Sequence, residues 1–134
     1  MLTVSITIRA DIFKIWDYFT NTIHITNWYF ASPDWHCPKA SNDLKVNGKF
    51  SFRMEAKDEA FGFDLEGTYS KVLLYEEINY FLVDERKVFV TFTKNENNVT
   101  VTEKFDPENE NSLELQGAGW QAILNNFKEY VEQH

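Results

Sequence analysis

The sequence has few residues of several kinds, and each scarcity excludes a class of protein. Its single cysteine, Cys37, allows no disulfide within the chain, which fits a reducing cytoplasm. Its 13 basic side chains face 21 acidic ones and form no cluster, which argues against binding to nucleic acid or an anionic membrane. No apolar run approaches the roughly 20 residues that span a bilayer. We therefore expect a cytoplasmic protein with no nucleic-acid partner and no membrane insertion.

Residues for metal binding and nucleophilic catalysis are also scarce. Zinc needs three or four converging donors, whereas His36 and Cys37 are adjacent, which is a poor chelate geometry, and only His24 and His134 remain. A nucleophilic thiol needs a base and an electropositive setting, so a buried and inert Cys37 is the favoured interpretation. The chain has no Gly-rich phosphate loop and no nucleophile elbow. We expect no metal, no cofactor and no dedicated catalytic residue.

Aromatic residues, by contrast, are abundant at 16% of the 134 residues. Large rings fill a core and also line apolar ligand pockets. The length predicts a single domain over residues 1–134. Acidic charge is concentrated in residues 53–134, which carry seventeen acidic and eight basic side chains, against four and five in residues 1–52.

Alternation of apolar and polar residues predicts six strands joined by short polar hairpin loops. The predicted strands cover residues 2–8, 50–57, 61–70, 78–82, 88–92 and 99–105. Helical spacing of apolar residues predicts two short helices, over 12–19 and 22–26, and a long C-terminal helix over 112–134. Asn111 and Glu114 match a capping box at the start of the long helix. Gly117 and Gly119 weaken that helix, a cost that would be tolerated if something must approach the helix closely there.

This order of elements predicts an α+β fold in which a curved antiparallel sheet of six strands wraps around the long helix. A sheet that curls around a helix leaves a gap where the two surfaces diverge, and such a gap is a natural ligand cavity. The aromatic residues and the alternation predict which side chains line it: Trp28, Trp35, Phe52, Met54, Phe63, Tyr69, Tyr80, Glu103, Gln116 and Trp120.

The segment "NWYFASPDWHCP", residues 27–38, concentrates aromatic residues and is interrupted by two prolines, so a long helix or a central strand is excluded. A core plug, a lid over a cavity and a partner-binding patch remain as alternatives. Its place in the order of elements favours a lid or plug, with Trp28 and Trp35 turned inward.

Glu103 is the most informative polar residue, because it shares a strand face with Val99, Val101 and Phe105. Strict alternation points its carboxyl inward, where it must be paired, protonated or in contact with a wet cavity. It would then act as a polar anchor or, with a raised pKa, as a general base. A β-bulge that returns Glu103 to solvent is the other interpretation.

Several segments together resemble the START-like (SRPBCC) superfamily with its helix-grip fold, and within it the family of activators of the heat-shock protein 90 ATPase. They are "W-x-F-x-S-P-x-W" (28–35), "NDLKVNGKFSFRM" (42–54), "LEGTY" (65–69), "DERKVFVTF" (84–92) and "QGAGWQAILNNFKEYVE" (116–132). The resemblance covers the whole chain and corresponds to the activator's C-terminal half. Similar sequences often have glycine where this chain has Asn47, Glu59 and Glu85. We expect the turns at Glu59 and Glu85 to differ accordingly.

The resemblance implies a fold but no single activity, because the superfamily includes lipid carriers, hormone receptors and polyketide cyclases. Our main hypothesis is a non-enzymatic protein that binds a small apolar or amphipathic ligand. A chaperone is the alternative partner that the resemblance implies, although the activator's chaperone contact depends heavily on a separate N-terminal domain. A cyclase-like or hydrolase-like enzyme that uses Glu103 is the second alternative.

Overall fold

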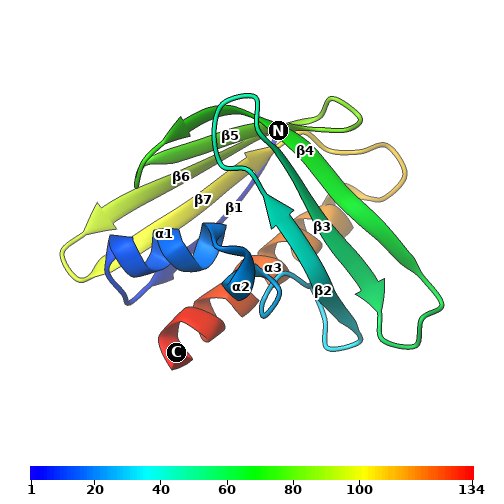
Figure 1. Ribbon diagram of the computed structural model, residues 1–134, viewed down its shortest axis with the longest axis horizontal. Coiled ribbons are helices and arrows are strands. Elements are labelled where there is room, and N and C mark those ends of the chain that lie inside the picture. Colours follow the sequence, from blue (N-terminus) through cyan, green and yellow to red (C-terminus); the bar gives the residue numbers. More distant parts are fainter.

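The computed structural model describes residues 1–134 and contains one antiparallel sheet that curls around a long C-terminal helix (Figure 1). Seven strands form the sheet in the order β1-β7-β6-β5-β4-β3-β2. The elements in chain order are β1 (Leu2–Ile8), α1 (Ile12–Thr20), α2 (Thr22–Ile25), β2 (Trp35–Asn42), β3 (Lys49–Ala56), β4 (Gly62–Leu73), β5 (Glu77–Leu82), β6 (Lys87–Asn95), β7 (Asn98–Phe105) and α3 (Leu113–Gln133). The predicted α+β helix-grip fold is confirmed.

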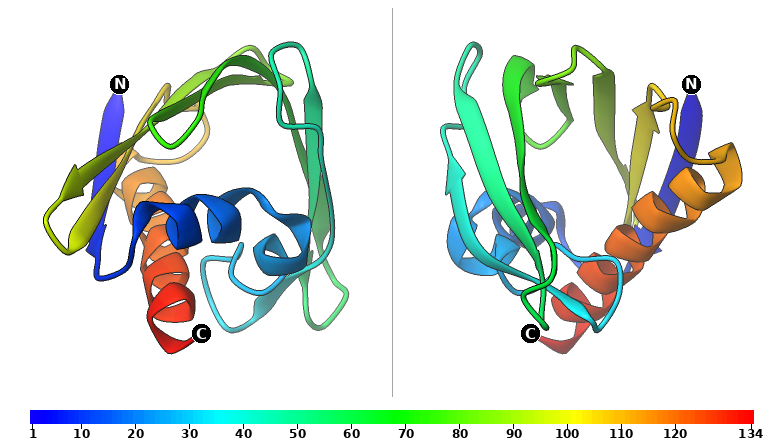
Figure 2. Two further views of the ribbon diagram at one scale, coloured as in Figure 1. Left: turned by 60° about the vertical axis from the view of Figure 1, so that its left-hand side comes forward. Right: turned by 90° about the vertical axis from the view of Figure 1, so that its right-hand side faces the viewer.

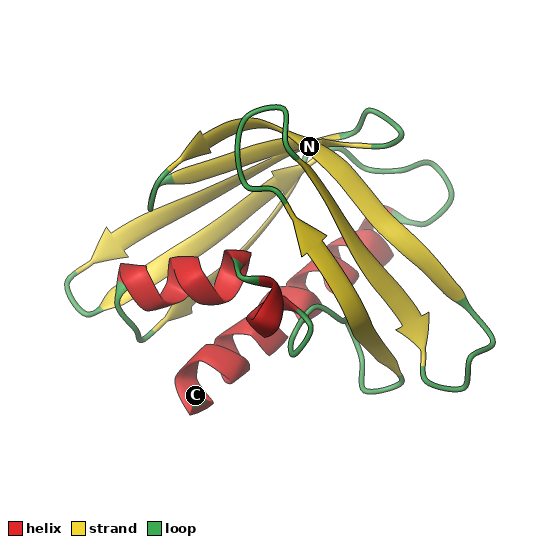
Figure 3. Ribbon diagram, in the orientation of Figure 1, coloured by secondary structure: helices red, strands yellow, loops and turns green.

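All three helices lie on the concave side of the sheet (Figure 3). Two further views show the strands as an arch, with α1 and α2 lying across its open side next to α3 (Figure 2). None of these helices is long and apolar enough to cross a lipid bilayer.

The sheet has one strand more than predicted, because β2 begins inside the aromatic segment 27–38. Pro38 hides this strand from sequence analysis, since proline cannot donate a ladder hydrogen bond. Two features allow it there: β2 is an edge strand, and its register against β3 shifts between His36 and Lys39, around the proline. Pro38 therefore lies at an irregularity of an edge strand, where its missing N–H matters least.

The hairpin turns keep the backbone conformation that glycine would favour. Asn47, Glu59 and Glu85 have φ angles of 69°, 63° and 71°. Our expectation that the turns at Glu59 and Glu85 would differ is therefore wrong. The surrounding hairpins impose a left-handed conformation on side chains that disfavour it.

Ser112 is the N-cap of α3, and its Oγ accepts a hydrogen bond from the backbone N–H of Leu115 at 3.1 Å. Asn111, the predicted cap, lies in the preceding loop instead, and its own N–H donates to Glu108 Oε1 at 2.7 Å. Either residue type caps a helix well, so the sequence pattern did not distinguish neighbours.

The two ends of α3 pack very differently. Leu124, Phe127 and Val131 near its C-terminus are completely buried, and α3 packs mainly against β1. Near the N-terminus, nothing lies within 4 Å of where a Cβ on Gly117 or Gly119 would be. No close approach therefore accounts for these glycines, and β3 and β4 lie apart from the helix at this end.

Trp28 is the plug of the core. It is 1% exposed, and its ring packs against Phe19 and Phe127 with centroid distances of 5.5 and 4.6 Å. Its Nε1–H donates to the carbonyl of Tyr18 at 2.9 Å, which satisfies its only polar group. The N-terminal part of the aromatic segment thus connects α1 to α3.

Relief of the left-handed strain can be measured at Glu59, an exposed residue in the loop between β3 and β4. Glu59→Gly should increase the free energy of unfolding by up to about 1 kcal/mol, because relief of the strain exceeds the entropy cost of glycine. Urea denaturation of the variant and the parent protein measures the difference. Glu59→Ala is the control, since it removes the charge and keeps the Cβ. An equal gain in both variants would attribute the effect to charge instead of strain.

Candidate functional site

The space between the diverging sheet and helix contains two adjacent hollows. The outer hollow, about 340 Å³, is lined by Ala31, Ser32, Trp35, Met54, Phe63, Asn111, Leu115, Gln116, Gly119, Trp120 and Ile123. The inner hollow, about 220 Å³ and more enclosed, is lined by Tyr29, Met54, Phe63, Leu65, Leu82, Arg86, Glu103, Trp120 and Ile123. Four side chains belong to both walls, so the hollows are neighbours along one surface of α3.

Six of the ten predicted cavity residues lie in these walls: Trp35, Met54, Phe63, Glu103, Gln116 and Trp120. The other four face the interior but lie in the packed core. Trp28 is the plug already described, and Phe52, Tyr69 and Tyr80 are each less than a tenth exposed and pack against Phe50. For the three strand residues, Phe52, Tyr69 and Tyr80, alternation predicted the inward face correctly but not the position along the sheet.

Five wall residues of the inner hollow were missed: Tyr29, Leu65, Leu82, Arg86 and Ile123. Leu65, Leu82 and Ile123 do lie on apolar positions that alternation or helical spacing assigns to the interior. Tyr29 and Arg86 come from irregular segments, where no periodicity indicates the direction of a side chain.

Glu103 lies on β7 between Val4 of β1 and Val90 of β6, with regular pairing on both sides. No bulge returns it to solvent, and it is 7% exposed. It lines the inner hollow, and no hydrogen bond or charge from another protein group offsets the effect of burial on its pKa. Burial raises the pKa of its carboxyl to about 8, so at neutral pH the neutral acid predominates.

The titratable neighbours of Glu103 are tyrosines and one arginine. Burial raises the pKa values of Tyr29 and Tyr80, and a charge on Glu103 raises both further. Arg86 lines the same hollow, but its Nε donates to Asp84 Oδ2 at 2.7 Å. Its charge is therefore compensated in the turn, and burial alone determines the pKa of Glu103.

Gln116 lines the outer hollow, but its polar atoms hold the loop before α3. Its Oε1 accepts from the N–H of Glu108 at 2.8 Å, and its Nε2 donates to the carbonyls of Glu108 and Asn111 at 3.1 and 2.8 Å. Both N–H donors of the amide and one of the two acceptor positions of its oxygen are already used. Gln116 thus shapes the wall and offers little to a ligand.

Trp120 is the largest side chain shared by both walls, and a ring of the sheet packs against one of its faces. Its indole stacks on Phe105 of β7 with centroids 3.8 Å apart and planes 6° from parallel. A ring fixed on one face presents its edge and remaining surface to the hollow as a rigid apolar wall.

The histidines and the cysteine have other partners. His24 Nδ1 lies 2.7 Å from Tyr130 Oη, and its ring stacks on Tyr18. His36 Nε2 lies 3.9 Å from Glu55 Oε2. Cys37 is buried, as predicted, and burial raises the pKa of its thiol to about 11, which leaves it unreactive at neutral pH.

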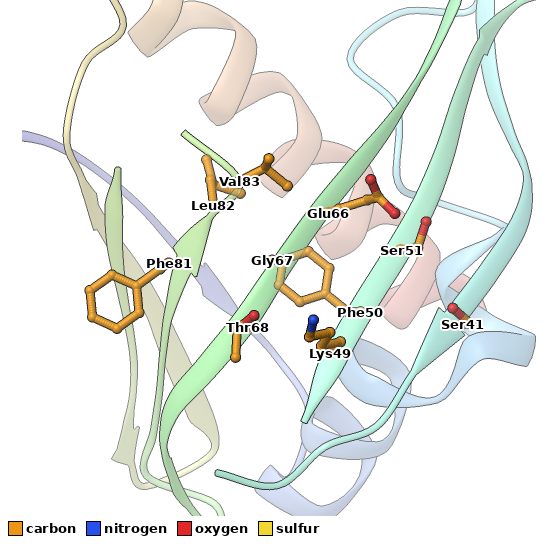
Figure 4. A pocket seen from close by; sticks show the side chains of 10 residues that line it. All are labelled: Ser41, Lys49, Phe50, Ser51, Glu66, Gly67, Thr68, Phe81, Leu82 and Val83. Atoms are coloured by element: carbon orange, nitrogen blue, oxygen red, sulfur yellow. The ribbon is translucent and has the colours of Figure 1, made fainter. Parts of the chain in front are cut away.

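A further hollow of about 370 Å³ lies on the opposite, outer face of the sheet, over β3, β4 and β5 (Figure 4). Gly67 lies at its floor and lets the Phe50 ring approach the backbone, because a Cβ there would lie 2.5 Å from that ring. Exposed side chains such as Lys49, Ser51 and Glu66 surround it. It contains no buried ionisable group, so the hollows on the concave side form the candidate site.

Titration of Glu103 makes the stability of the fold depend on pH. The folded state retains the proton up to about pH 8, whereas an unfolded glutamate loses it near pH 4.5, so folding binds a proton between these values. The free energy of unfolding should therefore fall with rising pH in this range, by up to about 1.4 kcal/mol per unit. Urea denaturation at pH 5, 6, 7 and 8 measures the slope.

Glu103→Gln removes this titration, so the free energy of unfolding of the variant should depend less on pH. The stability of the variant relative to the parent protein should therefore increase as pH rises. Glu66→Gln, which removes an exposed carboxyl from the outer face, is the matched control and should keep the parent slope. Parallel curves for the parent protein and Glu103→Gln would show that Glu103 is ionised at neutral pH despite its burial.

Comparison with known proteins identifies relatives of similar length and shape. A solution structure of an AHSA1-like protein from Aeromonas hydrophila is 37% identical with a TM-score of 0.90, over 98% of this chain and 93% of that one. Chr148 from Cytophaga hutchinsonii is 46% identical with a TM-score of 0.85, over 98% and 91%. CalU16 from Micromonospora echinospora, at 14% identity and a TM-score of 0.72 over 96% and 74%, shares the fold.

No curated protein is similar enough in sequence to count as a match. The sequence profile of the family described as "Activator of Hsp90 ATPase homolog 1-like protein" matches residues 9–132, which is nearly the whole chain. This match and the two structures above agree with the resemblance carried by the sequence motifs. The chain belongs to the activator of Hsp90 ATPase homolog 1-like family, within the START-like superfamily.

Proposed function

We propose that this protein binds a small apolar or amphipathic molecule in the outer and inner hollows. The observation that carries the proposal is Glu103, a buried carboxyl in the wall of the inner hollow without a hydrogen bond from the protein. Burying such a group without a partner costs free energy. A ligand that bonds to it in the hollow would recover that cost.

The walls support an apolar or amphipathic ligand. Seven of the nine side chains around the inner hollow are hydrophobic, and the outer hollow has the same character. Ligand sites typically combine apolar walls with a few polar groups that fix orientation, and Glu103 is such a group. The outer hollow, of about 340 Å³, falls within the size range of small-molecule sites.

The same carboxyl supports the cyclase-like or hydrolase-like alternative, because general acid–base catalysis is most efficient when the pKa lies near the working pH. Binding and catalysis separate in the Glu103→Gln variant once a ligand is identified. Loss of turnover with retained binding would favour an enzyme, and unchanged turnover would exclude Glu103 as the acid or base.

A chaperone contact is the alternative that family membership favours. Phe63 and Leu115, which are 51% and 61% exposed at the outer hollow, provide apolar surface for it. Association with purified Hsp90 and stimulation of its ATPase are the two measurements. Absence of both would remove this alternative.

Two glycines of α3 provide a matched test of ligand binding. Gly119 lines the outer hollow, whereas Gly117 lines neither hollow, and a side chain at either position meets open space. Gly119→Leu should fill the hollow and lower the affinity for the fluorescent apolar probe N-phenyl-1-naphthylamine at least tenfold. Gly117→Leu should bind it as the parent protein does. A fluorescence titration measures both.

Both substitutions should also increase the free energy of unfolding by up to about 1 kcal/mol, because leucine is a better helix former than glycine. Equal stabilisation shows that both variants are folded, so a difference in binding arises from the hollow alone. Failure of the parent protein to bind the probe, or equal binding by the two variants, would contradict the proposal.

A further inference from the structure

We propose that the inner hollow selects a primary amine with an apolar body, which places its ammonium group against the carboxyl of Glu103 and its body against Trp120 and Met54. This inference rests on the proposed function and specifies the ligand class. It follows from what surrounds Glu103, from the composition of the wall and from the charge of the whole chain.

The first argument is that the carboxyl has no counter-charge. The side chains opposite Glu103 on the two neighbouring strands are Val4 and Val90, and α3 contributes Trp120 and Ile123 to the wall. The titratable groups on its other sides are the hydroxyls of Tyr29 from the loop before β2 and of Tyr80 from β5.

Arg86 is the one cationic side chain in the wall of the inner hollow, and its partner is Asp84 instead of Glu103. The Arg86 side chain is 25% exposed, and its Nε donates to Asp84 Oδ2 at 2.7 Å. Arg86 is thus paired with Asp84, and no other cationic side chain lines the inner hollow with Glu103. A ligand ammonium would supply both the missing charge and the missing hydrogen-bond donors.

The second argument is the aromatic character of the wall. Trp120 and Tyr29 come from α3 and from the aromatic segment and both line the hollow together with Glu103. Indole and phenol rings attract cations through their electron-rich faces. A carboxylate that shares its hollow with such rings suits an amine better than a neutral alcohol and disfavours a carboxylic acid.

The third argument is long-range charge. The chain has a net charge of −8, and the excess of acid is concentrated in residues 53–134, which contribute most of both walls. Such a field raises the local concentration of cations and lowers that of anions.

Three probes with the same ring system and different charge test the inference: 1-naphthylmethylamine, 1-naphthylmethanol and 1-naphthylacetic acid. At pH 8 the amine should bind the parent protein at least tenfold more tightly than the alcohol, and the acid should bind most weakly. Glu103→Gln should remove the preference for the amine. Isothermal titration calorimetry measures the affinities.

The pH dependence gives a second test that needs no variant. With a carboxyl pKa of about 8, the ionised fraction of Glu103 is about fiftyfold larger at pH 8 than at pH 6, so the affinity for the amine should rise by about that factor. Binding at pH 7 should release a proton, which titrations in two buffers of different ionisation enthalpy detect. The alcohol should show neither effect.

The outcomes distinguish this inference from the function on which it rests. Equal binding of alcohol and amine, tighter binding of the acid, or an amine preference that survives Glu103→Gln would overturn the amine while the hollow remained a ligand site. If none of the three probes binds, or if Gly119→Leu leaves their binding unchanged, both proposals fail.

Discussion

The structure depends on the unequal packing of α3 against the sheet. At the C-terminal end, Leu124, Phe127 and Val131 are completely buried and fix the helix to the core. At the N-terminal end, Trp120 stacks on Phe105 of β7, whereas β3 and β4 lie apart from the helix. A helix that contacts one side of a curled sheet and not the other leaves a hollow between them. Every feature of the candidate site lies along that divergence.

Regular alternation along β7 places the one unusual group in this hollow. Val99, Val101 and Phe105 are almost completely buried, and the same face must accept Glu103 because neither pairing of β7 has a bulge there. Relief of the burial cost would require a local break in the sheet, which would also cost ladder hydrogen bonds. The carboxyl stays inside, and its proton is held more tightly as a result.

Much of the fold could be predicted from the sequence, because periodicity reports directly on strands and amphipathic helices. The six strands with clear alternation and the long helix are all present. The strand that was missed, β2, is the one that proline obscures, and its place depends on pairing with β3, a contact remote from any local signal. The turns at Glu59 and Glu85 show the same principle, since the hairpins override the preference of the residue.

The site could be predicted less completely. Alternation identified the inward face of β3 and β7, and hence Met54 and Glu103, but it does not report where along a face the core ends and the hollow begins. Tyr69, for example, faces inward as predicted, yet its hydroxyl donates to Asn42 and its ring belongs to the core. Tyr29 lies in an irregular segment, and only the folded chain shows that it faces Glu103.

The irregularity at Pro38 also protects the sheet from growing. An open sheet has two edges, and an unprotected edge is a template on which another chain can add a strand. On the β2 edge, Pro38 lacks an N–H and the register shifts beside it, so a continuous ladder cannot form. On the β1 edge, the carbonyl of Ser5 already accepts a hydrogen bond from Gln121 of α3 at 3.0 Å. Both edge strands, β1 and β2, are therefore protected against edge-to-edge aggregation, although the sheet does not close into a barrel.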